Sequence, residues 1–158
     1  MNGTMTLIFK KKELINELTS LFIQNAKTFK GLYGGFYLIS IEKNKTPLKV
    51  LNEFYQRISF IPNSNEVCSL LTPVLFRDKI SDKSLQKLIV IIFLAMDKAN
   101  IHGSAVNSVL KLTSKNVLHY QDWSGEKLYV DDQIRVYSPA WYQNGVLIEE
   151  GVCTIVSN

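Results

Sequence analysis

Cysteine and histidine are scarce in this chain, and the motifs that usually mark a metal or nucleotide site are missing. Its 158 residues include only two cysteines, Cys68 and Cys153, and two histidines, His102 and His119. Neither the Cys-x-x-Cys nor the His-Glu-x-x-His spacing of zinc sites occurs. The Gly-x-Gly-x-x-Gly and Gly-x-x-x-x-Gly-Lys-Ser/Thr motifs of phosphate-binding loops are absent too. The sequence therefore predicts no metal site and no cofactor, and two reduced, buried cysteines.

Long apolar runs are also absent. The longest, Leu88 to Met96, is about half of the roughly 18 to 20 residues that a membrane helix requires, so we interpret it as part of the core. Near the start of the chain, the basic residues 10–12 follow the short apolar run 6–9, which reverses the order found in a secretory signal. We therefore expect a cytoplasmic protein without a membrane span.

Glycine and proline are too few for a flexible linker. The chain has eight Gly and four Pro, and no segment repeats at a fixed period. By contrast, 46% of the residues are hydrophobic and 11% are aromatic, which is enough to bury a core at a length typical of one domain. We expect residues 1–158 to form a single domain.

Positive charge is concentrated in the first two thirds of the chain. Residues 1–100 contain 14 Lys or Arg against 8 Asp or Glu, whereas residues 101–158 contain 4 against 6. A weak nucleic-acid binder would use basic residues in and directly before the first predicted helix, which are Lys10, Lys11, Lys12, Lys27 and Lys30. Apart from residues 10–12 the lysines are scattered, which favours a solvated surface over a nucleic-acid site.

The spacing of apolar residues predicts helices up to about residue 103. Steps of three and four residues predict four helices, over residues 11–30, 47–58, 63–72 and 81–100. Thr46 is the expected N-cap of the second helix, and Ser81 or Asp82 that of the fourth. The run Phe36 to Ile41 is rich in aromatic and β-branched residues, which predicts a short strand. The fourth helix is apolar on all sides in its middle, so we expect it to be central.

After Gly103 the period changes to two, which is typical of strands. Alternation over residues 109–113 and 134–137 predicts two strands, and Asn144-Gly145 predicts a two-residue hairpin turn, because this pair favours positive φ angles. A last strand is expected over residues 152–156. The sequence thus predicts an α+β fold in which about four N-terminal helices and one short strand (residues 1–103) pack against a C-terminal antiparallel β-meander (residues 104–158).

The hairpin carries a resemblance to a known family. The segment Trp141-Tyr142-Gln143-Asn144-Gly145-Val146-Leu147-Ile148, with Val152, Thr154 and Val156 after it, resembles the last β-hairpin of GrpE-type nucleotide-exchange factors for Hsp70 chaperones. The resemblance covers about a tenth of the chain. Where that family typically places Arg-Pro-Ala, this sequence has Glu149-Glu150-Gly151. No functional residue of the family is assigned to this chain.

The run His119 to Gly125 has the most site-like composition, with an imidazole, a carboxylate and two large aromatics before a turn. A small hydrolase could use His119 and Asp122 with Cys68 or Ser124 as the nucleophile. The competing interpretation is structural: the aromatics cover the sheet edge, Asp122 and Ser124 shape the turn, and Cys68 packs in the core. The acidic pairs 131–132 and 149–150 could likewise hold a divalent cation or lie in solvent.

A role in protein interaction accounts best for a chain without catalytic motifs. Aromatic side chains concentrate binding energy where they are exposed at an interface. We therefore expect a small bacterial-type interaction protein, such as a chaperone, adaptor, immunity or effector component, that binds another protein or a second copy of itself through its C-terminal sheet. The expected anchors are Trp123, Tyr137, Trp141 and Tyr142.

Overall fold

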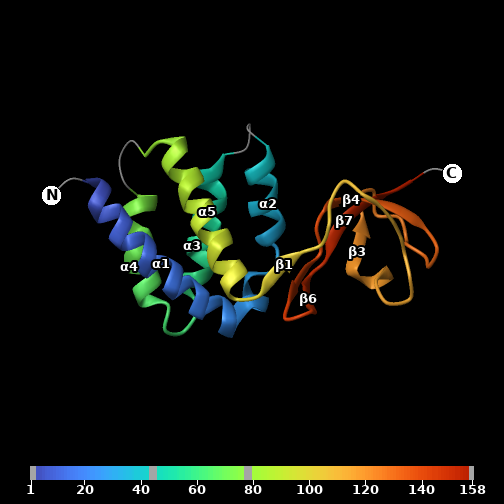
Figure 1. The fold of residues 1–158 in the computed structure, drawn as a ribbon, viewed down its shortest axis with the longest axis horizontal. Helices are drawn as coiled ribbons and strands as arrows, with labels where there is room; N and C mark the ends of the chain where they lie inside the picture. Colours follow the sequence, from blue (N-terminus) through green and yellow to red (C-terminus); the bar gives the residue numbers. More distant parts are fainter. Residues whose placement is uncertain (1–2, 43–45, 77–79, 157–158) are drawn as a thin grey trace. The chain divides into compact units, whose positions relative to one another are not determined.

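The computed structural model describes residues 3–42, 46–76 and 80–156, with the backbone alone over residues 3–10. It confirms the α+β class, with helices before residue 100 and strands after it (Figure 1). The chain divides into two compact units, Met1–Asn100 and Ile101–Asn158, which we call the helical unit and the β unit. Among the described residues, no helix combines the length and apolar character that crossing a membrane requires.

The helical unit contains five α-helices and a short 3-10 helix within its described residues. They are α1 (Gly3–Asn25), η1 (Ala26–Phe29), α2 (Tyr33–Ile41), α3 (Pro47–Ser59), α4 (Asn65–Leu75) and α5 (Asp82–Lys98). Helix α5 packs against α1, α2 and α3, and α4 packs against α1 and α3. Phe54 lies at the centre of an aromatic core, since its ring is 5.3 Å from that of Phe29 and 5.4 Å from that of Phe36.

The predicted strand over residues 36–41 is wrong, because this segment belongs to α2. Tyr33, Phe36 and Ile39 are buried at three-residue steps, which places them on one face of a helix. The Phe36 amide donates to the Leu32 carbonyl oxygen at 2.9 Å, as helical backbone does. Strand preference of a short apolar run is a weak local tendency, and packing of these three side chains in the core outweighs it.

The predicted start of α5 is confirmed, whereas the predicted cap of α3 is not. The Ser81 hydroxyl oxygen accepts a hydrogen bond from the Ser84 amide at 3.2 Å. Thr46 stands at the N-cap of α3, but its side chain makes no capping hydrogen bond. Pro47 in the first turn has no N–H that needs a partner, which helps this helix start without the cap.

One face of α5 is exposed, although the sequence predicted a central helix from its apolar residues on all sides. Leu88, Ile89 and Ile92 are buried, in line with the contacts of α5 to three other helices. Val90 and Leu94, four residues apart and so on the same face, are exposed. The neighbouring helices therefore cover only part of the circumference of α5.

The β unit contains two sheets. Its elements are β1 (Ile101–Gly103), β2 (Val109–Lys111), η2 (Val117–His119), β3 (Tyr120–Asp122), β4 (Gln133–Ser138), β5 (Trp141–Gln143), β6 (Val146–Glu149) and β7 (Gly151–Ile155). The strand orders are β1-β5-β6 and β2-β4-β7-β3. Antiparallel pairing dominates, but β3 runs parallel to β7, so the sheet is not the simple meander that was predicted. Alternation identifies the faces of a strand and not its neighbours.

The predicted hairpin turn is confirmed. Asn144 has φ 51° and Gly145 has φ 82°, which are the two positive angles of a type I′ turn between β5 and β6. At the start of β7, Gly151 allows a close approach of the backbone. A methyl group there would lie 2.6 Å from the Ala140 nitrogen and 2.8 Å from the Ser138 oxygen, so no larger residue fits without movement of the chain.

Candidate interaction surface

One face of the four-stranded sheet points away from the core of the β unit. Along β4, Ile134, Val136 and Ser138 are buried while the residues between them are exposed. The register continues this division, because exposed Thr154 on β7 lies opposite Arg135 and buried Cys153 lies opposite Val136. We define the outer face by the outward residues of all four strands, which are Val109, Lys111, Gln121, Gln133, Arg135, Tyr137, Val152 and Thr154.

Tyr137 of the outer face forms an aromatic pair with Trp123. Trp123, which follows β3 directly, is 72% exposed, and Tyr137 on β4 is 46% exposed. Their ring centroids are 6.4 Å apart at an interplanar angle of 61°. This edge-to-face arrangement is favourable for aromatic rings. The two side chains therefore form one exposed aromatic feature, although their strands are separated by β7.

The backbone around Trp123 is held by hydrogen bonds on both sides. The Trp123 amide donates to the Cys153 carbonyl oxygen at 2.8 Å. The Asp122 carboxylate accepts from the Ser124 hydroxyl at 2.5 Å, from the Ser124 amide at 3.0 Å and from the Glu126 amide at 3.2 Å. The hydrogen bond from the Ser124 hydroxyl is the main reason that the pKa of Asp122 lies below its ordinary value. The Asp122 carboxylate thus stabilises the loop that carries Trp123.

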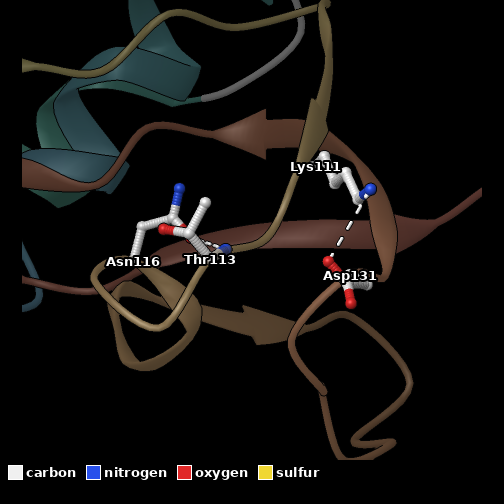
Figure 2. A network of polar contacts seen from close by, with 4 residues as sticks. All are labelled: Lys111, Thr113, Asn116 and Asp131. Carbon is white, nitrogen blue, oxygen red and sulfur yellow. Dashed lines mark hydrogen bonds and ion pairs between the residues drawn. The ribbon is translucent and has the colours of Figure 1, made fainter.

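The two basic residues of the outer face differ in their surroundings. Lys111 reaches from β2 to Asp131, with 3.7 Å between its Nζ and the Asp131 carboxylate (Figure 2). In the turn after β2, the Asn116 side-chain oxygen accepts a hydrogen bond from the Thr113 amide (Figure 2). Both partners of this ion pair are exposed, so it contributes little to stability. Arg135 has no ion pair among the residues that the structure describes. Its guanidinium is therefore available to a ligand or partner.

Behind the sheet, hydrogen bonds join four side chains in two pairs. His119 Nδ1 lies 2.8 Å from the Tyr142 hydroxyl. The Tyr120 hydroxyl donates to Ser104 Oγ at 3.1 Å, and the Ala140 amide donates to the same oxygen at 3.0 Å. Burial, followed by the nearby Tyr120, raises the pKa of Tyr142. We call these four side chains the polar network.

The residues of the suggested hydrolase site are engaged in other contacts. His119 bonds to Tyr142 and Asp122 bonds within its own loop, so no hydrogen bond between His119 and Asp122 is present among the described residues. Ser124 is brought to Asp122. Cys68 lies on α4 in the helical unit, where its thiol donates to Ser64 Oγ at 4.0 Å. The catalytic use of these residues stays a prediction.

The four expected aromatic anchors differ in exposure. Trp123 and Tyr137 are exposed, Tyr142 is half-buried in the polar network, and Trp141 is only 6% exposed. Trp141 pairs with Gly103 on β1, and a methyl group at Gly103 would lie 3.4 Å from its ring. Packing against this glycine helps to bury the Trp141 ring.

The sequence did not lead us to predict Arg135 as a binding residue, although its alternation pattern could have. Alternation over residues 134–137 already placed it on the same face of the strand as Tyr137. What the sequence does not provide is the position of Trp123 next to that face, because this depends on the parallel pairing of β3 with β7.

The remaining candidates are placed as follows. Lys11, Lys12, Lys27 and Lys30 are exposed, and the side chain of Lys10 lies outside the described residues. Both cysteines are free; burial raises the pKa of the Cys153 thiol to about 11, which makes it unreactive near neutral pH. No group of three or more His, Cys, Asp or Glu side chains in the described ranges is placed to hold a metal ion.

Comparison with protein-family models, curated proteins and solved structures finds no match for this chain. Its function is therefore argued from the chemistry of its own surface.

Proposed function

We propose that this protein binds another protein through the outer face of the β2-β4-β7-β3 sheet, with Trp123, Tyr137 and Arg135 as its anchors. The observation that supports the proposal most strongly is the exposed Trp123–Tyr137 ring contact on the same sheet as Arg135, which makes no ion pair with any described residue. Trp, Tyr and Arg are the residue types most enriched among the few side chains that carry most of the binding energy at protein interfaces.

The exposure of these rings leaves free energy to be gained on binding. Removing a large apolar side chain from water is favourable by about 1.5–3 kcal/mol. Trp123 is 72% exposed in the free protein, so most of its surface would still be available for burial against a partner. The charged and polar residues around it, including Gln121 and Thr154, would form the polar rim that surrounds such anchors.

The geometry of the loop also favours binding. Hydrogen bonds to the Trp123 amide and within the Asp122 loop hold the tryptophan backbone in place before any partner arrives. A side chain presented from a fixed backbone loses less conformational freedom on binding than one on a mobile loop. The proposed anchor is therefore partly preorganised.

Site-specific photocrosslinking in the native cell tests the proposal. A photoreactive phenylalanine derivative is placed at position 133 or 154 of the full-length chain, and, as a control, at position 60. Phe60 is 86% exposed on the helical unit, so both sets of positions are accessible to solvent. We expect one crosslinked protein at the outer-face positions and none in common with position 60. The same crosslinks at all positions, or none at the outer face, would contradict the proposal.

A further inference from the structure

The tip of the β5-β6 hairpin joins an asparagine to a glycine. Asn144 and Gly145 form the two-residue turn between Gln143 and Val146, which pair with each other across the hairpin. Both turn residues are exposed, and a methyl group on Gly145 would meet no atom within 4 Å. Solvent therefore reaches the Asn144 side-chain amide and the peptide bond that follows it.

Two neighbouring groups in this turn are not held by other contacts. Among the residues that the structure describes, neither the Asn144 side chain nor the Gly145 backbone amide has a hydrogen-bond partner. Glycine also has no side chain that would shield its nitrogen. The Gly145 nitrogen can therefore act as a nucleophile towards the side-chain carbonyl carbon of Asn144.

The attack requires the turn to open, because the Asn144 backbone must rotate to bring the Gly145 nitrogen next to the side-chain carbon. In the part of the chain that the structure describes, β6 is an edge strand and pairs only with β5. The pair nearest the turn is Gln143 with Val146. Fraying at the end of such a ladder costs much less free energy than unfolding the whole domain. The reactive conformation is therefore accessible from the folded chain.

We propose that Asn144 is a site of spontaneous deamidation in the folded protein. The Gly145 nitrogen loses its proton to hydroxide and forms a bond to the Asn144 side-chain carbon, which closes a succinimide ring. The bond from that carbon to the amide nitrogen breaks, and ammonia leaves with a proton from water. Water then adds to one of the two ring carbonyls and opens the ring to aspartate or isoaspartate. Either product carries a negative charge at neutral pH where the amide was neutral.

The two products differ in their effect on the hairpin. Aspartate keeps the normal main chain, and Asp-Gly favours the same type I′ turn as Asn-Gly. Isoaspartate adds one carbon to the main chain between Gln143 and Val146, so the two-residue turn no longer fits the register. Isoaspartate should therefore loosen the pairing of β5 with β6. The β2-β4-β7-β3 sheet has a separate hydrogen-bond ladder and should stay intact.

Peptide mapping by mass spectrometry, after incubation of the full-length protein near neutral pH, tests the proposal. The matched control is Asn100, which is exposed and has φ 60°, but is followed by the branched, buried Ile101. We expect deamidation at Asn144 to be at least roughly tenfold faster than at Asn100. Isoaspartate forms only through the ring, so both products should appear at position 144. The map separates this site from Asn2-Gly3, the other Asn-Gly pair of the sequence.

The dependence of the rate on urea distinguishes local opening from global unfolding. If only the hairpin tip opens, the rate at Asn144 should change by less than about twofold in urea concentrations below the unfolding transition. A reaction through the unfolded chain would accelerate steeply with urea, because the unfolded fraction rises exponentially. Such a steep rise, a rate at Asn144 no faster than at Asn100, or the absence of isoaspartate would overturn the proposal.

Discussion

The rings of Trp123 and Tyr137 meet edge to face with 6.4 Å between their centroids, although their strands do not pair with each other. Trp123 follows β3 and Tyr137 lies on β4, and each of these strands pairs with β7 on a different side. The contact therefore depends on the register of β7 with both neighbours. Changes in β7 or in the loop after β3 should affect this surface without touching either ring.

Gly151 provides the sharpest test of that register. Gly151→Ala places a methyl group 2.6 Å from the Ala140 nitrogen, and overpacking of this kind costs at least about 2 kcal/mol of unfolding free energy. The matched control is Gly35→Ala in α2, where the methyl group would lie 3.9 Å from Val50. There we expect a gain of about 0.5–1 kcal/mol, because alanine favours helix over glycine. Chemical denaturation of both variants measures the difference.

The Gly35 variant also tests the assignment of α2. If residues 36–41 formed the predicted strand, Gly35 would lie in the turn before it, alanine would bring no helical gain, and Gly35→Ala would be neutral or destabilising. Stabilisation of Gly151→Ala, or a loss of stability in Gly35→Ala that equals the loss in Gly151→Ala, would contradict the structure.

Asp122→Ala should loosen the Trp123 loop, because the Asp122 carboxylate accepts three hydrogen bonds there. The Ser124 hydroxyl is the main cause that lowers the pKa of Asp122 below 3.8. The stabilisation by the ionised Asp122 carboxylate is therefore fully present above pH 3.8 and is lost as the pH falls through the lower folded-state pKa of Asp122. We expect wild type to be more stable than the variant at pH 7 and the difference to vanish in strong acid, as measured by urea denaturation.

Glu126→Gln is the control for the Asp122 loop, since only the backbone amide of Glu126 takes part in the hydrogen bonds. It should leave the difference in stability between neutral and acidic pH unchanged. If Asp122→Ala and Glu126→Gln changed the free energy of unfolding equally, the Asp122 carboxylate would not be what stabilises the loop.

Glu17 on α1 should destabilise the helical unit as the pH rises. Burial is the first cause that raises its pKa above 4.5, followed by the charge of Glu66 and a hydrogen bond to it, and then by the charge of Glu13. Because the pKa of Glu17 is raised in the folded state, its ionisation lowers the free energy of unfolding. This loss is absent in acid, begins as the pH passes 4.5 and is complete above the folded-state pKa. Glu17→Gln should therefore gain unfolding free energy over wild type between pH 4 and pH 7.

The control for Glu17 is Glu53→Gln, which replaces an exposed carboxylate on α3 by the same amide. The difference in unfolding free energy between Glu53→Gln and wild type should change less between pH 4 and pH 7 than the difference for Glu17→Gln. If Glu17→Gln is less stable than wild type at pH 7, the repulsion between the Glu17 carboxylate on α1 and the Glu66 carboxylate on α4 is not present in solution.

Much of the helical unit could be predicted from the spacing of its apolar residues, because one buried face repeats every three to four positions. The run 36–41 was assigned wrongly since its aromatic and β-branched residues favour strands locally, while the core contacts of Tyr33, Phe36 and Ile39 are set by residues distant in sequence. The exposed face of α5 was missed for the same reason. Sequence does not tell how much of an apolar helix its neighbours cover.

In the β unit, alternation and the Asn144-Gly145 turn were sufficient to locate strands and their two faces. They were not sufficient to assign strands to sheets. Tyr137 could be predicted as exposed from its own strand, whereas Trp141 is buried because β5 pairs with β1 at Gly103. The contact of Trp123 with Tyr137 depends on long-range pairing that no local pattern reports.

The most direct test of the interface is the affinity of the crosslinked partner for the double variant Trp123→Ala/Tyr137→Ala, measured by calorimetry beside Phe60→Ala. Loss of a central aromatic anchor costs about 2 kcal/mol, so we predict binding at least roughly 30-fold weaker for the double variant, with unchanged binding for the control. Unfolding temperatures close to wild type would show that both variants are folded. Equal affinity of the double variant and wild type would contradict the assignment of this face as the binding surface.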